Sequence, residues 1–201
     1  MVVGFSFLAF VVFAVADWVA VSREQKEFEY VAKPAALAAL LIYATTGANP
    51  SGWLIAALAL SLLGDVYLML PANLFAAGLT AFLLAHVSYI AAFDASSTSR
   101  IVWLVVVLAA SSPVAMRVLR SMDDPTLRPA VVIYLVTIAL MVASACASGS
   151  LAAAVGAVLF FVSDGIIAWD RFVQKLPRAH LAIMVTYHVG QLLLATALRA
   201  G

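Results

Sequence analysis

The chain has 201 residues, of which 66% are hydrophobic and only 10% charged, and its formal net charge is +1. Soluble globular domains contain far fewer apolar residues, so this composition predicts an integral membrane protein. The small net charge, with no concentrated basic patch, argues against a nucleic-acid partner. Cys146 is the only cysteine, which excludes an intramolecular disulfide, and we expect it to be a small packing residue.

Eight apolar stretches are long enough to cross about 30 Å of hydrocarbon. The first could be taken for a signal peptide, but it lacks a basic N-terminal region and its apolar run suits a spanning helix better. The expected helices cover residues 2–21, 33–48, 52–70, 72–93, 101–120, 129–147, 150–169 and 180–199. The predicted fold is therefore all-α, a single polytopic membrane domain over residues 1–201.

Two prolines fall within these stretches. Pro34 lies in the first turn of the second stretch, where proline is tolerated because the first amides of a helix have no partner within it. Pro113 lies inside the fifth stretch, where we expect a kink.

Positive charges are distributed unevenly between the predicted loops. Cytoplasmic loops are enriched in Lys and Arg, so the richer side is expected to face the cytoplasm and both termini to lie outside it. The protein is then expected in a bacterial cytoplasmic membrane, as a multi-pass protein. The opposite side carries only Arg100 and Arg199. The richer side carries Arg23, Lys26, Lys33, Arg117, Arg120, Arg128, Arg171, Lys175 and Arg178.

Two aspartates interrupt otherwise apolar stretches, Asp65 in LLGDVYLMLP and Asp164 in LFFVSDGIIAW. Each lies about five or six residues before the predicted cytoplasmic end of its helix, which is roughly 8 Å deep at 1.5 Å per residue. Ionisable residues inside membrane segments are costly and indicate a functional site by default. The alternative is a buried structural pair of each carboxylate with an arginine or lysine.

Other polar side chains fall in the same half of the predicted bundle, and the outer half has almost none. Some recur at three- and four-residue steps, which places them on inward-facing helix faces lined with small residues. A pocket open to one face is expected rather than a continuous pore. Besides the helix-end cations, the polar residues are Asp17, Asn73, His86, Tyr134, Ser163, Tyr187, His188 and Gln191.

The cations near helix ends have two interpretations. They can anchor the ends by extending into the headgroup region, or they can bind a lipid phosphate. Lys33, Arg117 and Arg120 are the strongest candidates for phosphate binding.

Several motifs resemble those of the YhhN/TMEM86 family of membrane proteins, which includes lysoplasmalogenase. The resemblance covers the predicted helices from the second to the eighth. The motifs are Lys33-Pro34, Gly64-Asp65, Phe75-x-x-Gly78-Leu79-x-x-Phe82-x-x-x-His86-x-x-Tyr89, Gly156-Ala157-x-x-Phe160-x-x-Ser163-Asp164 with Arg171-Phe172, and Tyr187-His188-x-Gly190-Gln191.

This resemblance implies hydrolysis of the vinyl ether bond of lysoplasmalogens to a fatty aldehyde and a glycerophospho-alcohol. The substrate would be a lysophospholipid, and the presumed catalytic aspartates of the family would correspond to Asp65 and Asp164. The supporting residues would be Lys33, Asn73, His86, Arg117, Arg120, Tyr134, Ser163, Tyr187, His188 and Gln191. No cofactor is expected.

Vinyl ether hydrolysis needs a proton delivered to the β-carbon, followed by attack of water on an oxocarbenium-like cation. One carboxyl group should therefore be protonated and the other ionised, as in glycosidases that manage a similar cation. The sequence does not decide between the two aspartates. The adjacent Ser163 favours Asp164 as the base that activates water and Asp65 as the acid.

Two alternatives stay open. A zinc-dependent lipid hydrolase could use His86 and His188 with the two aspartates, although no closely spaced histidine pair is present. A proton-coupled transporter could use the same groups, and a loose likeness between the two halves of the chain is typical of transporters.

Overall fold

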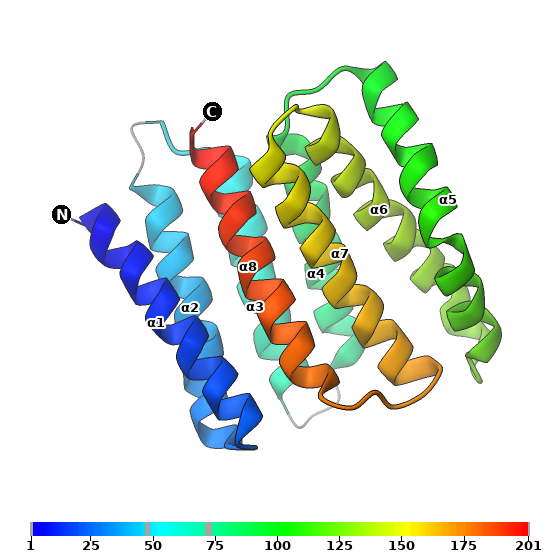
Figure 1. Ribbon diagram of the computed structural model, residues 1–201, viewed down its shortest axis with the longest axis horizontal. Helices are drawn as coiled ribbons and strands as arrows, with labels where there is room; N and C mark the ends of the chain where they lie inside the picture. The colour runs from blue at the N-terminus through cyan, green and yellow to red at the C-terminus, as the bar shows by residue number, and fades with distance from the viewer. Residues whose placement is uncertain (1, 47–48, 71–73, 201) are drawn as a thin grey trace. The chain divides into compact units, whose positions relative to one another are not determined.

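The structure is a computed structural model that describes residues 2–46, 49–70 and 74–200. These residues form eight α-helices and one short 3-10 helix, which confirms the all-α prediction (Figure 1). The α-helices are α1 (Val2–Ser22), α2 (Lys26–Thr45), α3 (Gly52–Met69), α4 (Phe75–Ala92), α5 (Ser97–Ser121), α6 (Arg128–Ala147), α7 (Leu151–Phe172) and α8 (Ala179–Ala200). The 3-10 helix η1 (Pro125–Leu127) joins α5 to α6.

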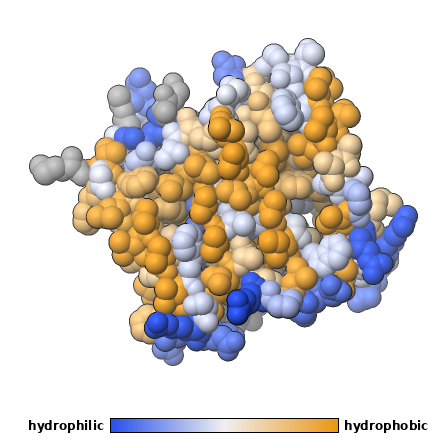
Figure 2. All heavy atoms as spheres, in the orientation of Figure 1, coloured by the Kyte–Doolittle hydropathy of each residue, from blue (hydrophilic) through white to orange (hydrophobic). Residues whose placement is uncertain are grey.

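Among the described residues, seven of these helices are long and apolar enough to cross a membrane, namely all except α2. Their outward faces carry many exposed large hydrophobic side chains, such as Leu8 at 60% exposure and Val105 at 62%. Figure 2 shows apolar residues along the helices and hydrophilic residues at helix ends. Exposed apolar surface on this scale needs a lipid environment. The chain is therefore an integral, multi-pass membrane protein.

Helix α2 differs from the expected segment 33–48. It begins seven residues earlier, at Lys26, and its last helical residue is Thr45. The apolar pattern starts only after Lys33, but the preceding charged residues continue the helix, and Glu27 and Glu29 stabilise its positive N-terminal end. The expectation for Pro34 was accordingly wrong, because this proline lies in the interior of the helix rather than in its first turn.

Two compact units divide the chain. Unit 1 contains the residues up to Ala92 together with those from Leu194 onward, and unit 2 contains Phe93–Leu193. In unit 1, α1 packs on α2, α2 on α3, and α3 on α4. In unit 2, α5 packs on α6 and on α7, and α6 packs on α7. Helix α8 contributes its first part to unit 2 and its last residues to unit 1.

The junctions between helices explain where several of them begin and end. Ser51 and Ser150 cap α3 and α7, because each hydroxyl accepts a hydrogen bond from the backbone amide three residues later. Gly149 precedes the second cap with a φ of 76°, a conformation that glycine adopts without penalty. Glu24 ends the α1–α2 turn with a φ of 57°, where a side chain costs about 1–2 kcal/mol.

Candidate functional site: two intramembrane carboxyl groups

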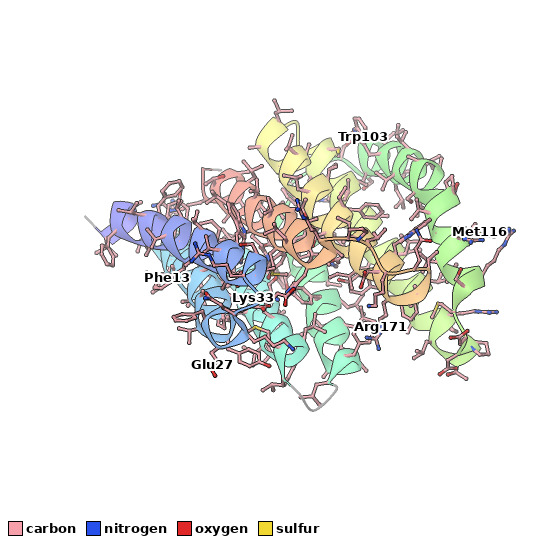
Figure 3. All side chains as sticks on the ribbon, turned by 60° about the horizontal axis from the view of Figure 1, so that its bottom comes forward. Phe13, Glu27, Lys33, Trp103, Met116 and Arg171 are labelled. Atoms are coloured by element: carbon pink, nitrogen blue, oxygen red, sulfur yellow. The ribbon has the colours of Figure 1, made fainter. Side chains whose placement is uncertain are left out.

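Asp65 lies on the buried face of α3 in unit 1, and its side chain meets Lys33 of α2. The Lys33 ammonium lies 3.0 Å from the Asp65 carboxylate. Both residues are buried, with exposures of 4% and 1%. Lys33 points inward from α2, whereas Glu27 on the same helix points outward (Figure 3). Isolated charges at this depth would be strongly unfavourable, so each group compensates the charge of the other.

Ser61 lies one helical turn before Asp65 and is fully buried. Within the described part of the chain, its hydroxyl has no hydrogen-bond partner. Residues four apart share a helix face, so this hydroxyl belongs to the same face as the Asp65 carboxylate. Gly64, the residue before Asp65, faces the Phe82 ring of α4. A methyl group at position 64 would lie 2.7 Å from that ring. The glycine therefore lets α3 and α4 pack closely beside the aspartate.

Asp164 lies on α7 in unit 2 and is half-buried. The Tyr134 hydroxyl of α6 donates a hydrogen bond of 2.5 Å to its carboxylate. This separation is at the short end of the range for hydrogen bonds between a hydroxyl and an oxygen acceptor, so the contact holds the two side chains in place. Helix α6 therefore orients Asp164 as α2 orients Asp65.

Helices α7 and α8 approach each other very closely around Gly190. A Cβ atom at this position would lie 2.9 Å from the Gly156 carbonyl oxygen and 3.0 Å from the Phe160 amide nitrogen. One turn away, the rings of Phe160 and Tyr187 meet edge to face with centroids 5.2 Å apart. Ser163 donates a long hydrogen bond of 3.4 Å to the Ile183 carbonyl of α8. These contacts fix the part of α7 that carries Asp164.

The two units position their aspartates by the same construction. Asp65 follows the capping residue Ser51 by fourteen residues, and Asp164 follows the capping residue Ser150 by fourteen. In each case the partner side chain comes from the preceding helix, from its eighth residue in α2 and its seventh in α6. The units thus repeat a pattern of capped helix, carboxyl group and partner, but one partner is an ammonium and the other a phenol.

The remaining predicted residues fall into three groups. His86 on α4, and Tyr187, His188 and Gln191 on α8, are buried, as their spacing indicated. Arg117 and Arg120 lie exposed in the last two turns of α5. Asn73, predicted to open the fourth helix, lies outside the described residues. The structure therefore brings together Lys33 with Asp65 and Tyr134 with Asp164, and it places the two arginines at the surface.

The described residues of each unit contain no group of three His, Cys, Asp or Glu side chains placed to hold a metal ion. The zinc alternative therefore has no set of ligands within the described part of either unit.

Two buried polar residues received too little weight in the sequence. Asp17 of α1 is fully buried, although the sequence placed it only near the end of the first expected helix. Ser61 was missed altogether. The available signals were the spacing of Ser61 from Asp65 and the place of Asp17 on the stripe that also carries Phe10, Ala14 and Ala20.

Comparison with known proteins assigns a family to this arrangement. The model of the YhhN family matches residues 28–198. The chain belongs to this family. The match includes both aspartates and both of their partners, but no residue of α1. No solved structure matches the chain.

Curated relatives include human lysoplasmalogenase TMEM86B, which is 39% identical over 145 residues. That match covers 72% of this chain and 62% of the human protein, so the chain spans less than two thirds of that relative. The mouse protein of the same name is 35% identical over 77% of this chain and 67% of its own length. The Mycobacterium bovis protein named lysoplasmalogenase is 32% identical over 78% of this chain and 65% of its own.

Proposed function

We propose that the protein is a lysoplasmalogenase-like membrane hydrolase that cleaves the vinyl ether bond of a lysophospholipid. The observation that carries the proposal is the pair of intramembrane carboxyl groups, each held by a side chain from the preceding helix. The family and the printed names of its relatives supply the substrate class. A soluble hydrolase has no need of carboxyl groups within apolar segments. A hydrolase that cleaves a lipid beneath its headgroup needs its acid and base at that level of the membrane.

The two carboxyl groups suit this reaction because it needs a proton donor first and then stabilisation of a positive charge. Protonation of the β-carbon generates an oxocarbenium-like cation, and a carboxylate stabilises such a cation, as in glycosidases. Attack of water then gives a hemiacetal, which collapses to a fatty aldehyde and an alcohol. In this proposal both Asp65 and Asp164 take part in the reaction. Both termini lie outside the cytoplasm, and the site opens to the cytoplasmic side.

In this proposal the surface arginines bind the lipid phosphate. Lys33 was a phosphate candidate, but its buried contact with Asp65 assigns it to the carboxyl group instead. Arg117 and Arg120 remain exposed at the end of α5, where a headgroup at the membrane surface is accessible.

The test is release of fatty aldehyde from a lysoplasmalogen by the purified protein in detergent. We expect Asp65→Asn and Asp164→Asn each to lower turnover by about 10²–10⁴-fold, the usual range for loss of acid–base catalysis. Asp170→Asn is the matched control, because Asp170 is on the same helix as Asp164 but pairs at the surface with Lys175 at 2.7 Å. Full turnover by both aspartate variants would contradict the mechanism.

The repeated construction of the two units also favours a second candidate, a proton-coupled transporter. Parallel internal repeats with intramembrane carboxyl groups are a common design of such proteins. Lysolipid flux across proteoliposomes without release of aldehyde would support the transporter and contradict the hydrolase.

A further inference from the structure

The two aspartates occupy corresponding places in their units, yet the partners that hold them differ in chemistry. Asp65 contacts an ammonium at 3.0 Å, and Asp164 contacts a phenol at 2.5 Å. Each aspartate follows its capping serine by the same number of residues, and each is held by a side chain from the preceding helix. The two sites therefore differ in the group that donates to the carboxyl group. This difference indicates how each carboxyl group is used.

An ammonium group carries three donors and no acceptor, so it can only donate to the oxygen beside it. It also compensates a negative charge, and a buried ion pair that loses one charge leaves the other uncompensated. Protonation of Asp65 would remove a negative charge that lies 3.0 Å from the Lys33 ammonium. The contact thus favours a carboxylate that remains ionised.

A phenol hydroxyl is both a donor and an acceptor. The Tyr134 hydroxyl donates to the Asp164 carboxylate, and the same hydroxyl can accept from the O–H of a protonated Asp164. The exchange changes the charge of Asp164 without breaking an ion pair, because the phenol is neutral in both states. The contact is therefore suited to a carboxyl group that gains and loses a proton during turnover.

We infer that Asp164 is the proton shuttle of the reaction and that Asp65 remains ionised throughout, with Lys33 and Tyr134 as the positioning residues that enforce these roles. The inference rests on the proposed hydrolysis. It reverses the assignment suggested by Ser163 in the sequence, which made Asp164 the base and Asp65 the acid.

The proton and electron balance closes with one shuttling group. Asp164 gives its proton to the β-carbon, the π electrons form the new C–H bond, and an ether oxygen lone pair forms the oxocarbenium bond. Water attacks the α-carbon, and its proton returns to Asp164, while Asp65 stays ionised. Asp164 then protonates the leaving alcohol oxygen and recovers the hemiacetal O–H proton as the aldehyde forms. One water is consumed, and both carboxyl groups return to their initial states.

Four variants test the two roles, because each changes the hydrogen-bond donor beside one of the two aspartates. Lys33→Arg keeps a donor-only cation beside Asp65, and Lys33→Met removes it. Tyr134→Phe removes the hydroxyl beside Asp164, and Tyr134→Lys replaces it with a donor-only cation. Binding of a saturated ether lysolipid and the melting temperature of each variant report whether the fold and the substrate site are retained.

For the Tyr134 variants, kcat should fall while KM stays unchanged. We expect a loss of about 10–100-fold for Tyr134→Phe, the usual effect of a hydrogen bond to a charged group. Tyr134→Lys should lose about 10²–10⁴-fold, since it fixes Asp164 as a carboxylate. The ratio of rates in H₂O and D₂O should rise in both. Lys33→Arg should keep most of the wild-type kcat, whereas Lys33→Met should lose most of it. The ratio of rates in H₂O and D₂O should stay unchanged in both Lys33 variants.

Infrared spectroscopy of the resting protein separates failure of this inference from failure of the proposed function. The C=O band of a protonated carboxyl group should disappear in Asp164→Asn and persist in Asp65→Asn, whether or not lysoplasmalogen is the substrate. Absence of aldehyde release with this band pattern would refute the substrate and keep the proton assignment. Loss of the band in Asp65→Asn alone, or wild-type kcat in Tyr134→Lys, would overturn the assignment.

Discussion

The contact between α7 and α8 predicts that Gly190 tolerates no side chain. In Gly190→Ala, the new Cβ would lie 2.9 Å from the Gly156 carbonyl oxygen, and ordinary contacts begin at 3.4 Å. The obstacle is backbone, so α8 must move by about 0.5 Å relative to α7. Overpacking of this kind costs about 1–3 kcal/mol. The higher helix propensity of alanine offsets about 0.5–1 kcal/mol of this cost.

The central values of these ranges leave a net loss of about 1 kcal/mol, which should lower the melting temperature in detergent by about 2–4 °C. Gly165→Ala is the matched control, because Gly165 lies on α7 with no atom within 4 Å of the added methyl group. It should melt at or slightly above the wild-type temperature. If Gly190→Ala melts with the control, the close approach of the two helices is not rigid and this reasoning is refuted.

Three further predictions concern charges and backbone conformation. Lys33→Met should destabilise the protein by about 3–5 kcal/mol, because it removes the positive charge of a buried ion pair. Addition of Asp65→Asn should recover part of this loss in a double-mutant cycle of melting curves, and strictly additive losses would argue against the ion pair. Glu24→Gly should stabilise the protein by about 1 kcal/mol by relieving a positive φ, whereas Gly149→Ala should destabilise it by a similar amount, both measured by chemical denaturation; the same sign for both would contradict the backbone argument. Hydrogen bonds from the Thr126 hydroxyl and amide hold the pKa of Asp124 below its usual value, so this contribution to stability should be complete above about pH 4 and be lost as pH falls through the lowered pKa. The melting-temperature difference between wild type and Asp124→Ala should narrow over that range, and a constant difference would exclude the effect.

The apolar runs predicted the helices because backbone polar groups in hydrocarbon must be hydrogen-bonded within the segment, as they are in a helix. The depth of both aspartates in the membrane stays a prediction. The inward faces of α4, α7 and α8 followed from spacing, since Phe82, Phe160 and Tyr187 are all buried. The start of α2 did not follow, because charged residues continue a helix beyond the hydrocarbon as readily as apolar residues do.

The partners of the aspartates needed the structure. Lys33 and Tyr134 were both candidates, but spacing along a chain does not say which side chain on one helix meets which on the next. The interpretation of Lys33 as a phosphate ligand reflected its charge and its expected place at a helix end, and its burial beside Asp65 changes that interpretation. The role of Gly190 was equally hidden, because a glycine in an apolar run gives no sign of what lies opposite it.

The composition of α2 has a consequence for the biogenesis of the protein. Among the described helices, α2 alone is too polar to qualify as a membrane span, and Lys33 is a main reason. The hydrophobicity of such a segment is too low to drive its insertion from the translocation channel into lipid without another helix. The ion pair of Lys33 forms when α3 delivers Asp65, which is synthesised later. We therefore expect α2 and α3 to enter the membrane together as a hairpin, so that Asp65 contributes to insertion as well as to the proposed chemistry.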